Sequence, residues 1–250
     1  MNRPAAGIYL HWPFCERKCP YCDFYTFGRE HPYHSLEIEY RQALVREIGS
    51  VHDRLDLGGR PTADTVYFGG GTPSLMGVAT LEELMQRLGE VFDIAPGAEV
   101  TLEVNPTTAE SAGLDRFRAA GVNRLSVGSQ SFNDRTLERL GRVHDSATTH
   151  RALDRMRALG FDNISLDLMF AVPGQTVEDC RRDLDIVLVF APEHVSAYGL
   201  TIHDGTPYAR WQREGRLSTP GDDDYVRMYR MLIDRLAEAG YRHYEISNWA

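Results

Sequence analysis

Short apolar runs alternate with longer amphipathic segments along most of the chain. The short runs predict strands, which cover residues 7–12, 65–70, 99–105, 124–130, 163–170 and 194–200. In the longer segments apolar residues recur at helical spacing, which predicts helices over 35–52, 80–92, 110–120, 146–159, 176–190 and about 222–239. The strand-like run HYEIS follows the last helix. Strands that alternate with helices in this way predict an α/β protein.

Three predicted helices end in the same way. The segments AAGVNRLSV, ALGFDNISL and EAGYRHYEI each end an alanine-containing helix at a glycine, namely Gly121, Gly160 and Gly240, and a strand follows. Glycine at this position adopts the left-handed conformation that closes a helix. Repeated helix-to-strand junctions of this kind build a parallel sheet through right-handed crossovers.

Polar and glycine-rich residues recur at the carboxyl ends of the predicted strands. Active sites of (β/α) barrels are built at that end, so we expect a partial or complete (β/α) barrel. A doubly wound open sheet is the alternative, because the strand order cannot be read from the sequence. The segment LGGRPTAD at 57–64 is the one expected flexible loop.

The composition is that of an ordinary globular protein. Of 250 residues, 42% are hydrophobic and 25% are charged. The net charge of −9 argues against a nucleic-acid partner, since there is no basic excess to neutralise phosphates. No run of about 18 apolar residues predicts a membrane span, and the N-terminus resembles no secretory signal. Four cysteines are too few for a disulfide scaffold, so we expect a cytoplasmic protein with reduced thiols.

Three of those cysteines lie within the stretch HWPFCERKCPYCDF. Cys15, Cys19 and Cys22 follow the first predicted strand at a C-x3-C-x2-C spacing, whereas Cys180 lies in a helical pattern and is expected to be a buried small residue. A structural zinc site needs four ligands, which His11 could complete. A 4Fe–4S cluster held by three thiolates would instead leave one iron open to a small molecule.

This motif, with an aromatic residue directly before its last cysteine, resembles the radical S-adenosylmethionine (SAM) superfamily. The resemblance implies a partial (β/α)6 TIM-type barrel with parallel strands, and a 4Fe–4S cluster on Cys15, Cys19 and Cys22. In that family the open iron binds the amino and carboxylate groups of SAM. Reduction then cleaves the cofactor to methionine and a 5′-deoxyadenosyl radical, while the protein holds and shields the reacting atoms.

A second motif, GGGTPSL, follows the second predicted strand. A glycine triplet there permits close backbone approach and presents N–H donors to a carboxylate, although a tight turn alone would explain it equally well. In the family that it resembles, this motif contacts the methionyl end of SAM. The resemblance therefore assigns Gly70, Gly71 and Thr72 to the amino and carboxylate groups of the cofactor.

Further motifs resemble the coproporphyrinogen dehydrogenase-like group, and within it the haem chaperone (HemW-like) branch. They are TLEVNP, GVNRLSVGSQSF, LERLGRVH, ISLDLMFAVPGQT and YEISNWA. By this resemblance Tyr9 and Tyr21 flank the cluster and SAM, and Glu103 accepts a hydrogen bond from SAM. The same resemblance places Gln130, Arg142 and Asp167 around the rest of the pocket, where some relatives hold a second SAM.

The polar residues of this set also have a physical argument. Glu103, Gln130 and Asp167 interrupt apolar runs, and such a residue needs a partner or a ligand. The alternative for Asp167 is a buried ion pair with Arg142.

Two departures separate the chain from the oxygen-independent coproporphyrinogen III oxidases that it resembles. Those enzymes carry a further cysteine where this chain has Phe24, and they have a longer segment before the first strand. Both differences favour the chaperone branch, whose members bind haem and deliver it to acceptor proteins. The implied partners are haem, haem-accepting proteins and an electron donor such as flavodoxin or ferredoxin. A porphyrinogen oxidase, a related radical SAM methyltransferase and a zinc-stabilised barrel are the competing hypotheses.

The same branch continues past ISNWA into a C-terminal domain with a His-Asn motif implicated in haem binding. We therefore expect a radical SAM core at 1–240, the start of that further domain at 241–250, and a C-terminally truncated chain. No residue is assigned a catalytic role, and SAM cleavage is left open. His11, His144, His194 and His203 are expected to be hydrogen-bonded residues rather than haem ligands.

Overall fold

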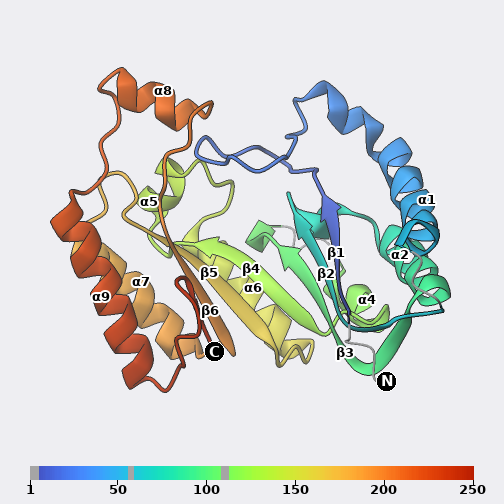
Figure 1. Cartoon of the computed structure of the whole chain (residues 1–250). Coiled ribbons are helices and arrows are strands. Elements are labelled where there is room, and N and C mark those ends of the chain that lie inside the picture. The colour runs from blue at the N-terminus through green and yellow to red at the C-terminus, as the bar shows by residue number, and fades with distance from the viewer. Residues whose placement is uncertain (1–5, 56–58, 108–112) are drawn as a thin grey trace. The chain divides into compact units, whose positions relative to one another are not determined.

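A computed structural model describes residues 6–55, 59–107 and 113–250 of the chain (Figure 1). The chain forms two compact units. The first unit comprises Met1–Arg17, Tyr25–Val104 and Ser111–Leu125. The second unit comprises Lys18–Phe24, Asn105–Glu110 and Ser126–Ala250.

The first unit is built on three parallel strands in chain order, β1 (Ala6–Trp12), β2 (Thr62–Gly70) and β3 (Asp93–Val104). Its helices are α1 (Glu37–Leu55), α2 (Val78–Val91) and α4 (Leu114–Ala119), with short 3-10 helices η1 (Pro32–Leu36) and η2 (Pro73–Leu75). Val66, Phe68 and Leu102 are fully buried, as are Leu81 and Leu84 of α2. Because side chains alternate along a strand, Tyr9, Tyr67 and Glu103 lie on the opposite face of the same sheet.

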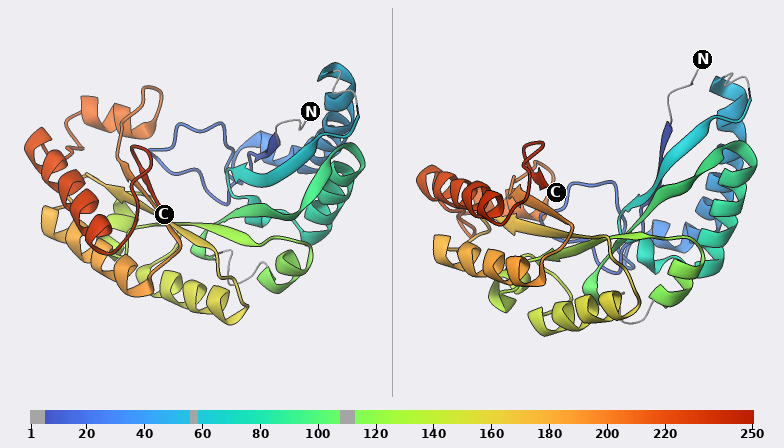
Figure 2. Two further views of the ribbon diagram at one scale, coloured as in Figure 1. Left: turned by 60° about the horizontal axis from the view of Figure 1, so that its bottom comes forward. Right: turned by 90° about the horizontal axis from the view of Figure 1, so that it is seen from below.

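The second unit contains most of β4 (Arg124–Gln130), together with β5 (Ile164–Phe170), β6 (His194–Gly199) and β7 (Asn248–Trp249). β5 and β6 pair in parallel, and β7 pairs with β6 in the antiparallel direction. Its helices are α5 (Asp134–Arg139), α6 (Ser146–Ala158), α7 (Val177–Phe190), α8 (Pro207–Arg213) and α9 (Asp222–Glu238). Figure 2 shows α6, α7 and α9 side by side along these strands.

The predicted glycine ends of helices are confirmed. Their φ angles are 107° at Gly121, 80° at Gly160 and 95° at Gly240. In each case the next residue's amide bonds back to the helix, as when Val122 N donates to Phe117 O at 3.1 Å. Helix α5, which was not predicted, ends in the same way at Gly141, with a φ of 68°. This turn leaves the Arg142 amide bonded to Leu137 O at 2.9 Å.

Three expectations about elements are revised. The expected loop 57–64 is partly strand, because β2 begins at Thr62, and residues 57 and 58 lie outside the described residues. The run HYEIS is not a strand, although His243 forms an isolated bridge with Trp249. The strand is β7, which comprises the next two residues and pairs with the edge of β6. The expected helix 110–120 is α4, and 110–112 lie outside the described residues. In the part of the chain that the structure describes, no helix is long and apolar enough to cross a membrane.

Candidate functional site

The predicted cluster ligands are divided between the two units. Cys15 belongs to the first unit, whereas Cys19 and Cys22 belong to the second. All four cysteines of the chain are thiols, and Cys15 and Cys180 are the buried ones. Among the described residues no three His, Cys, Asp or Glu side chains already form a metal-binding group. Ligation by the three cysteines therefore stays a prediction, and each half of the site is defined within its own unit.

In the first unit the glycine motif packs directly against the backbone around Cys15. Gly71 N donates to Trp12 O at 2.7 Å, and Thr72 N donates to Phe14 O at 2.9 Å. A β-carbon at Gly71 would lie 2.8 Å from Phe14 O and 2.9 Å from Cys15 Sγ. This confirms the predicted close backbone approach, because only glycine leaves room for the Cys15 thiol there.

The amide donors of the motif differ from the expectation. Gly70 N donates to Glu103 Oε2 at 2.9 Å, and the amides of Gly71 and Thr72 donate to carbonyls of the cysteine loop. In this structure these N–H groups donate to acceptors of the protein itself, and the contact of the three residues with the amino and carboxylate groups of SAM stays a prediction. The motif here fixes the protein around Cys15 and Glu103.

Glu103 lies at the carboxyl end of β3 and is held on both oxygens. Tyr67 Oη donates to its Oε1 at 2.8 Å, and Gly70 N donates to its Oε2 at 2.9 Å. Burial raises the pKa of Glu103 above its ordinary value, although these two hydrogen bonds act against that shift. The ring of Tyr9 stacks on that of Tyr67 with their centroids 6.0 Å apart. Sequence reasoning missed Tyr67, since an aromatic residue in a strand is ordinary.

His11 has both ring nitrogens engaged. Nε2 lies 3.0 Å from Tyr25 O, a pure acceptor, so this nitrogen carries the proton. Nδ1 then accepts from Tyr9 Oη at 3.0 Å. A Cys3His zinc site would need one of these nitrogens as a ligand, so the structure gives that alternative no support.

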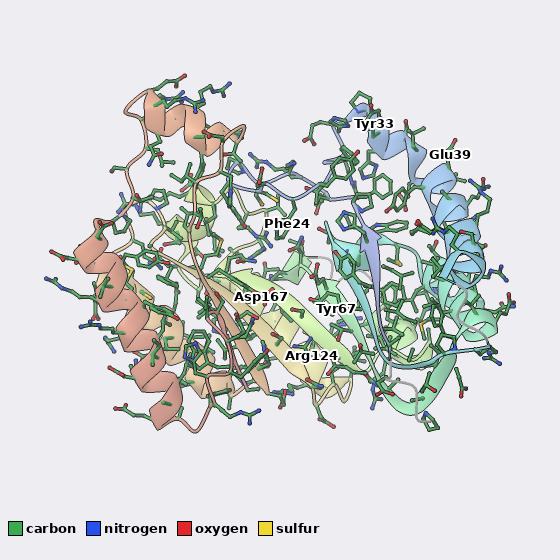
Figure 3. The ribbon with its side chains drawn as sticks, viewed as in Figure 1. Phe24, Tyr33, Glu39, Tyr67, Arg124 and Asp167 are labelled. Atoms are coloured by element: carbon green, nitrogen blue, oxygen red, sulfur yellow. The ribbon has the colours of Figure 1, made fainter. Side chains whose placement is uncertain are left out.

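In the second unit the loop carrying Cys19 and Cys22 is closed by several contacts. Lys18 Nζ donates to Phe24 O at 2.9 Å, and Cys22 N donates to Cys19 O at 3.1 Å. Tyr208 N donates to Pro20 O at 3.2 Å. The side chain of Phe24 is 69% exposed, so this position contributes little to the packing of the loop (Figure 3).

Arg142 is fixed by acceptors of the protein. Its Nη2 donates to Gly128 O at 2.9 Å and also to Asn105 Oδ1, and its Nη1 donates to Cys19 Sγ at 3.6 Å. These acceptors are residues other than Asp167, with which an ion pair was considered from the sequence. Asn105 was not singled out from the sequence, although it stands in TLEVNP beside Glu103.

Tyr21 lies beside the same thiol and the same guanidinium. Its ring centroid lies 6.1 Å from that of Tyr208, with the two rings tilted by 60°. Burial raises the pKa of Tyr21 well above its ordinary value; nearby Arg142 lowers this pKa, and Cys19 and Cys22 raise it further. Burial by itself would lower the pKa of Arg142, yet Tyr21 and Cys19 outweigh burial and raise it. The guanidinium therefore stays charged.

Gln130 and Asp167 complete the predicted pocket residues. Gln130 ends β4 with a φ of 64°, a backbone conformation that residues other than glycine rarely adopt. A β-carbon at Gly128 would lie 3.2 Å from Gln130 Nε2 and 3.3 Å from Arg142 Nη2. Asp167 on β5 accepts from Ser126 Oγ at 3.5 Å. Gln130 and Arg142 thus converge on Gly128, whereas the Asp167 carboxylate contacts Ser126.

The histidines considered as haem ligands all have partners in the protein. His144 is buried with Nε2 at 3.2 Å from Ser129 O, and burial lowers its pKa to about 4. His194 lies between Ser165 and Tyr244, each at 2.7 Å. His203 Nδ1 lies 3.8 Å from Asp23. His144 and His194 are thus hydrogen-bonded residues, whereas His203 is an exposed residue beside Asp23.

A buried carboxylate fixes the turn after β4. Asp183 on α7 accepts from Ser131 Oγ and from Phe132 N, both at 2.7 Å. Burial raises its pKa from 3.8 to about 6, against the effect of these hydrogen bonds. Cys180, one turn away, is buried as predicted, and burial raises its thiol pKa to about 12.

Asp183 makes a testable contribution to the pH dependence of stability. A carboxyl group whose folded-state pKa is raised stabilises the fold when protonated, and this contribution is lost as the pH rises from about 4 to above 6. Relative to Asp183→Asn, the wild type should lose up to about 3 kcal/mol of unfolding free energy over that interval. Urea unfolding of both proteins across it measures the difference. Parallel stability curves would contradict the assignment.

Comparison with known proteins now gives the class. The family model described as "Radical SAM superfamily" matches residues 9–187 of the chain. The chain belongs to the radical SAM superfamily. Its fold is also that of coproporphyrinogen III oxidase (HemN) from Escherichia coli, with a TM-score of 0.85 at 27% identity over 100% of this chain and 56% of that one. The predicted class, a partial (β/α)6 barrel with parallel strands, is thereby confirmed.

Within this superfamily the chain is similar to proteins named for haem handling. It is 39% identical over 243 residues to "Heme chaperone HemW" of Mycobacterium tuberculosis, covering 97% of this chain and 62% of that protein. It is 38% identical to the mitochondrial "Radical S-adenosyl methionine domain-containing protein 1" of Mus musculus, covering 98% of this chain and 54% of that protein. The predicted resemblance to the HemW-like branch is confirmed, over somewhat more than half of the length of these relatives.

Proposed function

We propose that the chain holds a 4Fe–4S cluster through Cys15, Cys19 and Cys22. This proposal rests on the contacts of the thiols: the Cys15 thiol packs against Gly71, and Arg142 donates to Cys19 Sγ. Thiolates are the usual ligands of such clusters, and hydrogen bonds to their sulfurs are typical of these sites. The donor set therefore fits the cluster.

SAM is the proposed second cofactor. Tyr9, Gly70, Gly71, Thr72 and Glu103 would bind it from the first unit. The residues proposed from the second unit are Tyr21, Gln130, Arg142 and Asp167. Cluster and cofactor together would supply the reductive cleavage of a carbon–sulfur bond.

The chain's own residues would prepare the cofactor site. Tyr67 and Gly70 hold the Glu103 carboxylate in place before any ligand arrives, so its remaining lone pairs can accept from a cofactor hydroxyl or ammonium. Tyr21 lies beside Cys19 and would shield the cluster and the cofactor from water on that side. Arg142 adds a fixed positive charge, which favours a carboxylate nearby.

The proposed role is that of a haem-trafficking protein, which binds haem and passes it to acceptor proteins. It is supported by the relatives named as haem chaperones and by Phe24, which stands where the oxidases that the chain resembles have a cysteine. A flavodoxin or ferredoxin as electron donor, and a place in the cytoplasm, belong to this proposal. Oxidation of coproporphyrinogen III is the second candidate, and the fold of HemN favours it.

One incubation separates the two candidates. The reconstituted protein, as its gene encodes it, is mixed under anaerobic conditions with a reductant, SAM and coproporphyrinogen III, and separately with haem. We expect haem to bind at about one equivalent and the porphyrinogen to be recovered unchanged, because the relatives' chaperone role requires binding without turnover. Porphyrins are measured by chromatography after oxidation, and haem by its absorbance. Protoporphyrinogen formation would refute the chaperone proposal.

A further inference from the structure

The sulfur of Cys19 accepts a hydrogen bond that the closure of its loop does not require. The backbone contacts of Cys22 N and Tyr208 N, and the Lys18 side chain, already fix the loop. Arg142 Nη1 nevertheless donates to Cys19 Sγ at 3.6 Å, and the side chain of Tyr21, whose pKa Cys19 raises, lies beside the same residue. All of these residues lie in the second unit.

The guanidinium is aimed at the sulfur by acceptors on its other side. Gly128 O and Asn105 Oδ1 both bind Nη2, which leaves Nη1 directed at Cys19. Arg142 and Tyr21 are also partly buried, and a donor in a region of low dielectric constant interacts more strongly with a charge than one in water. The arrangement is therefore pre-organised to stabilise negative charge on one sulfur.

Charge on a ligand sulfur is what a bound cluster changes when it takes up an electron. Hydrogen bonds to the sulfurs, net charge and solvent exposure set the reduction potential of an iron–sulfur cluster. Donors outside the first coordination shell tune a metal site in the same way. We propose that Arg142 and Tyr21 raise the reduction potential of the cluster by donating to Cys19 Sγ. This inference rests on the proposed cluster.

The test is an equilibrium redox titration of the reconstituted protein, in which dithionite supplies one electron per cluster through mediators and the reduced form is counted by electron paramagnetic resonance. Tyr21→Phe removes only the hydroxyl, and Arg142→Gln removes the charged donor. Tyr208→Phe is the matched control, because Tyr208 is a buried tyrosine against the Tyr21 ring whose hydroxyl donates to Arg139 O at 2.6 Å.

We expect more negative midpoint potentials for Tyr21→Phe and Arg142→Gln, with the larger shift for Arg142→Gln because it also loses a charge. Tyr208→Phe should keep the wild-type value. Iron content and the absorbance of the cluster show that each variant is loaded. If Arg142→Gln does not fold, Tyr21→Phe decides alone. A fully loaded Tyr21→Phe with the wild-type potential would overturn the inference, whereas a wild type that takes up no cluster would overturn the proposed function with it.

Discussion

Cys19→Ala should leave the protein without a stable iron–sulfur cluster. With only Cys15 and Cys22 remaining, the cluster loses one of its three protein ligands, and Arg142 loses the sulfur to which it donates. We expect iron content after anaerobic reconstitution to fall by about tenfold or more. Iron and acid-labile sulfide per chain are the measurements, together with visible absorbance.

Cys180→Ala is the matched control for this substitution. Cys180 is a buried thiol on α7, with a pKa that burial keeps high, and it packs as a small apolar residue. Its loss should cost about 1 kcal/mol of stability and leave iron content unchanged. Equal loss of iron in both variants would show that Cys180 is a ligand and that the assignment of the three clustered thiols is incomplete.

Gly71→Ala should lower the stability of the first unit and disturb the packing around Cys15. Its new β-carbon would lie within 2.9 Å of Phe14 O and Cys15 Sγ, and the first of these is backbone that cannot rotate away. Overpacking of this kind costs about 1–3 kcal/mol. Because the Cys15 segment must move, we also expect poor retention of iron. Urea unfolding and iron analysis measure the two effects.

Gly77→Ala provides the comparison within the same stretch. Gly77 precedes α2 with a φ of −67°, and a β-carbon there meets nothing within 4 Å. Its stability should stay within about 0.5 kcal/mol of the wild type, with normal iron content. Similar losses in the two variants would mean that glycine content as such, rather than the contact with Cys15, is what matters.

Most of the architecture could be predicted because its signals are local. The strands and longer helices follow from hydrophobic periodicity, and Gly121, Gly160 and Gly240 mark helix ends whatever surrounds them. The short helices α5 and α8 were missed because six or seven residues carry too little periodicity. The strand β7 was misplaced because its two residues form a strand by pairing with the edge of β6, which is a tertiary property.

The sequence indicated which residues belong to the candidate site, but it did not indicate the contacts between them. The cysteine and glycine motifs name Cys15 and Gly71, but nothing in the sequence says that the glycine amides are used within the protein. Tyr67 and Asn105 act through side-chain contacts over 36 and 37 positions of sequence, to Glu103 and Arg142 respectively. Pairings over such separations depend on the strands being brought together, which no local pattern reports.

Two separate constraints require glycine at Gly141, unlike at the helix-ending Gly121 and Gly240. Its φ of 68° requires glycine for the turn that ends α5. A β-carbon there would also lie 2.6 Å from Pro20 Cδ in the cysteine loop, whereas Gly121 and Gly240 have nothing within 4 Å. Asparagine, which tolerates left-handed backbone better than most residues, would meet only backbone strain at Gly121 and Gly240, whereas at Gly141 it would also collide with Pro20. For anyone transplanting this cysteine loop into a designed scaffold, the helix end beneath Pro20 has to be carried along with it.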